Sequence, residues 1–181
     1  AGVEFAVLKV IDKSNKTESS FVRNYAGASA QGLPLDVYNY LYTTTEAAAR
    51  EAAKAVINAL AGRKIGKVWA DAEDACLKNK GIQLIRILNT YKAVIEAAGY
   101  EFGVYTGLSF YNSYIKPYKA YIDCDFWIAR YPSTKDMTIA MDPPASKKPA
   151  ICHNLWGWQH SSRGKVSGIS GYVDLDICYT K

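Results

Sequence analysis

Apolar and polar residues along this chain follow two different periods, and the period changes from one segment to the next. Short runs of apolar or aromatic residues predict seven β-strands, at residues 5–10, 36–42, 67–71, 102–106, 125–130, 155–160 and 173–178. Three other segments, residues 20–31, 43–62 and 81–98, predict helices. Strands that alternate with helices are typical of a parallel α/β sheet.

The ends of these segments support the assignment. Thr43 and Glu46 stand three positions apart, as in a capping box that opens a helix, and Gly62 is a helix stop. Prolines within residues 134–150 predict an exposed loop. The absence of a Gly-x-Gly-x-x-Gly or phosphate-binding loop argues against a nucleotide-binding open sheet. Because helices become sparse late in the chain, we predict an irregular TIM-like (β/α) barrel with fewer than eight helices and one strand unaccounted for.

Composition narrows the class of protein. The 181 residues suit a single domain over residues 1–181, and 49% hydrophobic with 22% charged residues is typical of a globular protein. No apolar run approaches the roughly 20 residues that cross a bilayer, so membrane insertion is not expected. The net charge of +5 is scattered along the chain, which argues against nucleic-acid binding. The cysteine spacing predicts no metal site and leaves free thiols and disulfides both open, at Cys76, Cys124, Cys152 and Cys178.

The predicted strand at residues 67–71 ends in acids, in the stretch "KVWADAED". Because residues i and i+2 of a strand point the same way, Asp71 and Glu73 are expected to project side by side where strand gives way to loop. In α/β barrels this end of the sheet carries the chemistry. Two adjacent carboxylates repel, so one of them holds its proton more tightly, and such a pair suits cleavage of a glycosidic bond. The alternative is a solvated acidic turn.

Aromatic residues gather near the ends of the predicted strands. They are Tyr38, Tyr40 and Tyr42 on one strand face, and Tyr105, Trp127, Tyr131, Trp156 and Trp158 near later strand ends. Sugar rings present flat C–H faces that stack on such side chains, and phenol and indole groups add hydrogen bonds. Each residue taken singly is better explained by core packing. As a group beside carboxylates, they favour a carbohydrate cleft.

Two further acids lie in the last predicted strand, within "YVDLDIC". Asp174 and Asp176 are again at positions i and i+2 and are able to share a face. An acid in an otherwise apolar strand needs a partner or a role. Asp174 is therefore a third candidate site residue, with capping or a buried salt bridge as the structural alternative.

These residues also resemble those of a known family. The stretches "WADAED", "GVYTGLSFY", "FWIARY" and "LWGWQHSSRGKVSGISGYVDLD" are similar, in order, to conserved segments of the family-25 glycoside hydrolases. Members of that family are lysozymes of bacterial and phage origin that cleave peptidoglycan as N-acetylmuramidases. The resemblance covers nearly the whole chain. It implies a peptidoglycan hydrolase that cleaves the β-1,4 bond between N-acetylmuramic acid and N-acetylglucosamine and needs no metal or organic cofactor.

The resemblance also implies a role for each matching residue. Glu73 is expected to be the general acid/base, Asp71 to orient the 2-acetamido group of the substrate, and Asp174 to line the same pocket. The residues expected to line the sugar cleft are Tyr38, Tyr40, Tyr105, Trp127, Tyr131, Trp158 and Gln159. The expected workplace is the bacterial cell wall, reached by secretion or as a phage endolysin.

Three features depart from the family pattern. The family opens with a strand that reads Gly-Ile-Asp-Val-Ser, and this chain starts beyond it, so we expect an N-terminally incomplete domain in which the first strand is missing. His160 stands where a tyrosine usually follows Trp-Gln, and Asp176 stands where asparagine is usual. These two substitutions bear on substrate preference more than on reaction type.

Two other functions stay open. A non-catalytic cell-wall-binding relative, or a truncated inactive fragment, would keep the aromatic cleft and bind without cleaving. A chitinase-like hydrolase also places Asp-x-Glu at a strand end, but the longer Asp-x-x-Asp-x-Asp-x-Glu run of the family-18 chitinases is absent before Asp71. Peptidoglycan and chitin as alternative substrates separate the two hydrolases.

Overall fold

The computed structural model describes residues 2–179. Its strands are β1 (Ala6–Lys9), β2 (Leu35–Tyr40), β3 (Lys67–Asp71), β4 (Glu101–Gly107), β5 (Asp125–Ala129), β6 (Met137–Thr138), β7 (Asn154–Lys165) and β8 (Val173–Cys178). Its α-helices are α1 (Phe21–Ala30), α2 (Glu46–Leu60), α3 (Ile82–Ala97) and the single turn α4 (Leu108–Phe110). Shorter 3-10 and π turns lie at Ala75–Leu77, Tyr111–Ile115, Lys116–Tyr121 and Ala145–Lys147.

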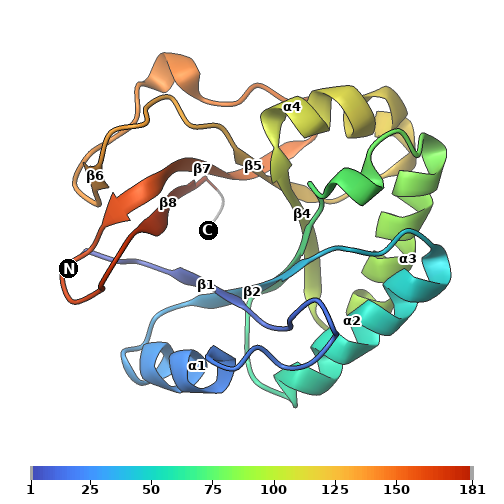
Figure 1. Cartoon of the computed structure of the whole chain (residues 1–181), viewed down its shortest axis with the longest axis horizontal. Helices are drawn as coiled ribbons and strands as arrows, with labels where there is room; N and C mark the ends of the chain where they lie inside the picture. Colours follow the sequence, from blue (N-terminus) through green and yellow to red (C-terminus); the bar gives the residue numbers. More distant parts are fainter. Residues whose placement is uncertain (1, 180–181) are drawn as a thin grey trace.

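The strands form one curved sheet in the order β1-β2-β3-β4-β5-β7-β6, with β8 beside β7. Every pair from β1 to β7 is parallel, and β8 runs antiparallel to β7. The sheet curls into a half-barrel, and α1, α2 and α3 lie outside its curve (Figure 1). The predicted irregular TIM-like barrel with fewer than eight helices is confirmed. In the part of the chain that the structure describes, β1 pairs with β2 alone, and all four of its residues are partly exposed.

Three details of the predicted elements were wrong. The segment 134–150 is not wholly irregular, because Met137 and Thr138 form β6 and pair with the far end of β7. Strand β7 continues to Lys165, five residues beyond the predicted end. The last strand is not parallel to the others, since β8 returns beside β7 as an antiparallel partner. The connection from Lys165 to Val173 is too short for the crossover that a parallel strand needs.

The N-cap of helix α2 lies two residues beyond the predicted one. Its N-cap is Thr45, not Thr43: the Thr45 hydroxyl accepts a hydrogen bond from the Ala48 amide at 3.2 Å. Glu46 is therefore the first helical residue, and its carboxylate accepts bonds from Gln83 (3.3 Å) and Thr90 (3.5 Å) on α3. The acid expected to cap the helix instead joins α2 to α3.

Buried side chains form one cluster on each face of the sheet. The outer cluster joins the sheet to the helices through residues such as Val68 and Val104. The inner cluster lies within the curve and consists of Trp69, Tyr105, Trp127, Ala129 and Trp156. Gly103 makes room for it, because a Cβ at this position would lie 2.2 Å from the ring of Trp69. The half-barrel therefore has an aromatic interior.

The amino ends of the strands carry a network of charges. Lys67 Nζ lies 2.8 Å from both Glu101 and Asp125, and its side chain is only 9% exposed. Asp36 accepts bonds from the Lys67 amide and from the Trp69 indole, each at 2.8 Å. Each of these charged groups has an opposite charge or a donor in contact, so removal of Lys67 would leave Glu101 and Asp125 without their cation.

Two further observations bear on the sequence-based expectations. No helix in residues 2–179 is long and apolar enough to cross a membrane. Cys76, Cys124 and Cys152 form no disulfide in this structure. Burial raises the pKa of Cys124 to about 12 and that of Cys76 to about 11, so both thiols stay protonated at neutral pH.

Candidate functional site

Strand β3 delivers the first two candidate acids. Trp69 and Asp71 share the inner face of β3, and Asp71, its last residue, is 5% exposed. Ala72 is held on both sides, since its amide bonds to the Tyr105 carbonyl and its carbonyl accepts from the Thr106 hydroxyl at 2.7 Å. Glu73 follows at once and is partly exposed. The strand end thus fixes Asp71 deep in the half-barrel and Glu73 nearer to solvent.

Burial and like charges act together on these two acids. Burial and then the neighbouring Glu73 raise the pKa of Asp71 to about 8, and Lys9 opposes this while Asp174 adds to it. Burial and Asp174 also raise the pKa of Glu73. One oxygen of Asp71 is buried without a hydrogen-bond partner in the described residues. At neutral pH the pair therefore holds a proton, and in the unliganded protein Asp71 holds it more tightly than Glu73.

The third acid, Asp174, comes from β8. Because β8 runs antiparallel to β7, its first residues lie at the end of the sheet where the parallel strands finish: Val173 pairs with Gly164. Asp174 lies close enough to act electrostatically on Asp71, Glu73 and Tyr38. The structure therefore brings together the three acids that the sequence singled out.

Four of the predicted cleft tyrosines surround these acids. Burial is the largest cause of the raised pKa values of Tyr38, Tyr40, Tyr105 and Tyr131, and one or more of these carboxylates raise each pKa further. Tyr105 and Tyr131 donate to Oε1 of Gln159 at 2.7 and 2.5 Å. Exposure differs widely, with Tyr105 at 7% and Tyr131 at 46%. The group thus has buried side chains at the bottom of the site and exposed side chains at its edge.

Trp127 joins this group from the inner aromatic cluster. Its ring lies 4.5 Å from that of Tyr105 and 5.7 Å from that of Trp69, centre to centre. The Trp127 indole donates to Asp176 Oδ1 at 2.8 Å. The predicted sugar-contacting side chains Trp127, Tyr105 and Gln159 therefore lie on one wall, in which Tyr105 contacts the Trp127 ring and hydrogen-bonds Gln159.

Trp158 is placed differently from the other predicted cleft residues. It is 1% exposed, its indole donates to the Arg130 carbonyl at 2.7 Å, and its ring lies edge-on to His160. The register between β5 and β7 shifts next to Trp127, so the alternation of β7 side chains is broken before Trp158. In this conformation Trp158 has no surface left on which a sugar could stack.

Two residues of the site escaped the sequence-based reasoning. Lys9 on β1 pairs in register with Tyr38, forms an ion pair with Glu18 at 3.6 Å, and lowers the pKa of Asp71. Asp74 accepts a bond from the Tyr40 hydroxyl at 3.2 Å and caps the turn after β3. The only signal for Lys9 was its inward position in the alternation of the strand at 5–10.

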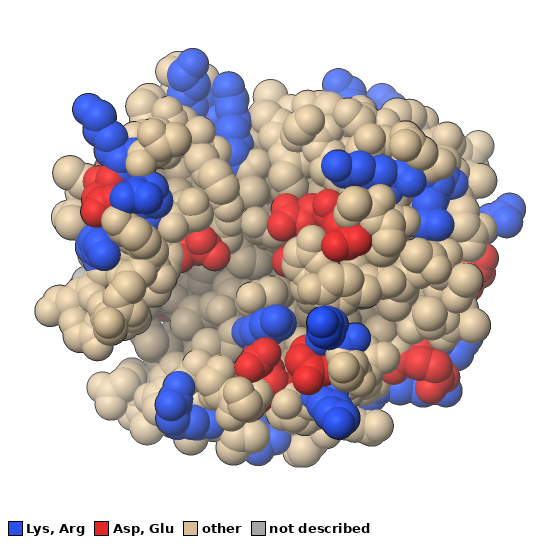
Figure 2. All heavy atoms as spheres, in the orientation of Figure 1, with Lys and Arg blue, Asp and Glu red and all other residues tan. Residues whose placement is uncertain are grey.

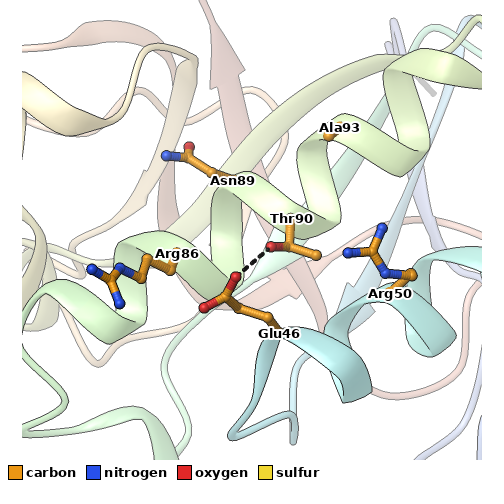
Figure 3. Close-up of a pocket in the computed structure, with 6 residues that line it drawn as sticks. All are labelled: Glu46, Arg50, Arg86, Asn89, Thr90 and Ala93. Carbon is orange, nitrogen blue, oxygen red and sulfur yellow. Dashed lines mark hydrogen bonds between the residues drawn. The ribbon is translucent and has the colours of Figure 1, made fainter.

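The surface shows a hollow where these residues converge. Within the curve of the sheet the face in Figure 2 is hollowed, and acidic side chains lie on opposite sides of the hollow. A separate pocket lies between α2 and α3 (Figure 3), lined by Glu46, Arg50, Arg86, Asn89, Thr90 and Ala93. That pocket holds a single acid and no aromatic residue, so it lacks the features of the candidate site. No group of three or more His, Cys, Asp or Glu residues in positions 2–179 is arranged to hold a metal ion.

Known proteins are similar to this chain in sequence. The autolytic lysozyme of Clostridium acetobutylicum is 27% identical over an alignment of 180 positions, which covers 97% of this chain and 49% of that protein. The uncharacterized protein YegX of Escherichia coli K12 is 23% identical, over 97% of this chain and 59% of YegX. This chain thus spans only about half of the length of these relatives.

Solved structures agree with the fold. The modular autolysin LytC of Streptococcus pneumoniae superposes with a TM-score of 0.77 at 22% identity, over 98% of this chain and 41% of LytC. The catalytic domain of the endolysin ply40, from bacteriophage P40 of Listeria monocytogenes, superposes with a TM-score of 0.75 at 22% identity. The match covers 98% of this chain and 83% of the ply40 chain. The sequence model described as glycosyl hydrolases family 25 matches residues 1–169. With three carboxyls converging at the end of an aromatic half-barrel, this chain belongs to family 25 of the glycosyl hydrolases.

Proposed function

We propose that this domain hydrolyses peptidoglycan by cleaving the β-1,4 bond between N-acetylmuramic acid and N-acetylglucosamine. The observation that carries the proposal is the convergence of Asp71, Glu73 and Asp174, with raised pKa values, beside an aromatic wall. Family membership supports the reaction class, and the autolytic lysozyme among the relatives supports the substrate.

In this mechanism Glu73 is the general acid. Burial and Asp174 raise its pKa, which favours the protonated form that a leaving oxygen requires. Glu73 is also more exposed than Asp71, so it is the carboxyl that a glycosidic bond reaches first. Proton transfer to the glycosidic oxygen breaks its bond to the anomeric carbon, and the leaving sugar keeps the electron pair. The ionised Glu73 then takes a proton from a water molecule whose oxygen bonds to the anomeric carbon, which restores the protonated Glu73.

Asp71 prepares the other side of the bond. Asp71 must be ionised in this step, so the proton that it holds in the unliganded protein passes to Glu73 or to water when the substrate binds. The negative Asp71 then orients the 2-acetamido group or stabilises the positive charge at the anomeric carbon. Its burial makes this charge effective, because little water screens it. Asp174 lines the same pocket and favours a positive charge there.

The aromatic wall binds the sugars. Tyr38, Tyr40, Tyr105, Tyr131 and Trp127 offer ring faces and hydroxyl groups next to the acids, and Gln159 fixes two of the hydroxyls. Carbohydrate rings stack on such faces. This arrangement needs neither a metal nor an organic cofactor.

Digestion of purified peptidoglycan tests the proposal. The wild-type chain is compared with Glu73→Gln and with Glu51→Gln, a matched change of an exposed acid that pairs with Lys54 on α2. We expect new reducing ends on N-acetylmuramic acid from the wild type and from Glu51→Gln, and a loss of at least about a hundredfold with Glu73→Gln.

Other outcomes select the other functions. Binding to the wall without new reducing ends, unaffected by Glu73→Gln, selects a non-catalytic wall-binding protein. Cleavage of chitin with peptidoglycan intact selects a chitinase-like hydrolase. Reducing ends on N-acetylglucosamine contradict the proposed bond specificity but keep the acid mechanism.

The proposed workplace is the bacterial cell wall, reached by secretion or by release of a phage endolysin at lysis. Solved structures with this fold include endolysins and an autolysin, which supports this setting. The net charge of +5 favours approach to an anionic wall, although physiological salt weakens this attraction beyond about 8 Å.

A further inference from the structure

Asp176 occupies the centre of a hydrogen-bonded group on the inner face of the half-barrel. It lies opposite Gln159 across the β7–β8 pair, and its Oδ1 accepts from the Trp127 indole at 2.8 Å. The Gln159 side chain lowers the pKa of this carboxyl, as a hydrogen-bond donor does. Gln159 and Trp127 are 3% and 5% exposed, and Asp176 is half-buried. Asp176 thus faces two buried donor side chains from two different strands.

The orientation of the Gln159 amide follows from its other partners. The hydroxyls of Tyr105 and Tyr131 both donate to Gln159 Oε1. A glutamine amide has one acceptor oxygen and one donor nitrogen. Since the oxygen is used by the tyrosines, the amino group of Gln159 faces Asp176. The amide orientation that suits the two tyrosines therefore also suits an acceptor at position 176.

We propose that Asp176 is a positioning residue of the sugar cleft: its carboxylate holds the indole of Trp127 and the amide of Gln159, and through Gln159 it orients Tyr105 and Tyr131. This proposal rests on the proposed function, in which these aromatic side chains form the wall that binds the sugars. Asp176 itself touches no substrate. It acts by keeping the ring faces and hydroxyls of the wall in one arrangement before a sugar arrives.

An acid suits this position better than an asparagine does. A carboxylate only accepts hydrogen bonds, whereas an asparagine would turn its own amino group toward one of the two donors. The bonds from Trp127 and Gln159 lower the pKa of Asp176, against burial and the nearby Asp174, which raise it to about 7. Above this pH the carboxylate makes charge-assisted bonds, which are stronger than neutral ones.

An exchange of acid and amide tests the proposal. Affinity for soluble glycan strands from peptidoglycan is measured by calorimetry at pH 8 in the Glu73→Gln background, where no cleavage interferes. Asp176→Asn and Gln159→Glu are made singly and together. Each single change is expected to weaken binding about tenfold, or about 1.4 kcal/mol. The double change restores one acceptor for each donor, so we expect it to bind more tightly than either single variant.

A role in stability alone predicts a different pattern. In that case the single variants would lower the melting temperature and leave the affinity of the folded protein unchanged, which overturns the proposal. Additive losses in the double variant also overturn it. If Asp176→Asn fails to fold, Trp127→Phe, which removes only the indole donor and part of the ring, is expected to show the same loss of affinity.

The same experiments separate this inference from the proposed function. A wild-type chain that cleaves nothing, while binding still depends on Asp176, contradicts the hydrolase and supports the positioning role. Cleavage with normal affinity in Asp176→Asn supports the hydrolase and contradicts the positioning role. If the Glu73→Gln chain binds no glycan at all, the proposed cleft is wrong, and the positioning role falls with it.

Discussion

Replacement of Asp71 by asparagine should make the folded protein more stable at neutral pH. Asp71 is 5% exposed, and its pKa rises from an ordinary value of 3.8 to about 8 on folding. A raised pKa means that the folded chain binds the proton more tightly than the unfolded chain. The stability that this proton contributes is fully present below pH 3.8 and is lost as the pH rises through about 8.

The size of the effect follows from the shift. Each pH unit above the ordinary pKa costs about 1.4 kcal/mol relative to a group that stays neutral, so at pH 7 Asp71 costs up to about 4 kcal/mol. An asparagine avoids this cost but adds an amino group without a partner, which costs about 2 kcal/mol. We therefore expect Asp71→Asn to raise the free energy of unfolding by about 2 kcal/mol at pH 7 and by nothing at pH 5.

Urea unfolding at pH 5, 6, 7 and 8 measures this difference. Asp74→Asn is the matched control in the same segment. Asp74 accepts a bond from the Cys76 amide at 2.8 Å, which lowers the pKa of its carboxyl, so its loss should destabilise the chain by the same amount at every pH. If the Asp71→Asn and wild-type stabilities run parallel from pH 5 to pH 8, the pKa of Asp71 is not raised, and the shared proton of the proposed mechanism is refuted.

Three further changes test the packing described above. Lys67→Met removes the cation between two carboxylates at the amino end of the sheet and should lower the free energy of unfolding by about 3 kcal/mol, measured in urea, with glycan affinity unchanged. Gly103→Ala places a Cβ 2.2 Å from the Trp69 ring, so little folded protein is expected, and a normal melting temperature would contradict the packing. Thr45→Ala should cost about 1 kcal/mol. Thr43→Ala should cost nothing, because the buried Thr43 hydroxyl has no hydrogen-bond partner among residues 2–179; thermal unfolding distinguishes the two caps.

The alternation of residues predicted most of the sheet, and its failures have physical causes. Strand β3 runs from Lys67 to Asp71 as predicted, because a short apolar run bounded by Gly66 and an acidic turn has few other conformations. Strand β8 also has the predicted bounds, but not the predicted direction. The direction of β8 depends on the length of the connection before it. The sequence predicts too long a connection, because residues 161–163 are polar and do not look like a continuation of β7.

The candidate site was predictable in its residues and less so in its electrostatics. Asp71 is the last residue of β3, as the strand pattern predicts, but Glu73 lies beyond the strand, so the i, i+2 rule does not by itself place its side chain. The spacing says nothing about which acid is buried more deeply, and the larger pKa shift of Asp71 depends on the aromatic interior and on Lys9 from a distant strand. The orientation of Trp158 was likewise beyond a local rule, because a register shift reverses the alternation just before it.

The ion pairs of Lys67 have a consequence for engineering this domain. Lys67 and Asp71 are the first and last residues of β3, about 13 Å apart along the strand. The amino end holds compensated charges that favour folding, and the other end holds uncompensated acids that oppose it. Changes at the two ends should therefore combine additively. One library of variants can stabilise the amino end of the sheet and so offset the free energy of unfolding that the acids cost. A second library can vary the sugar wall, and variants selected separately from the two can then be combined.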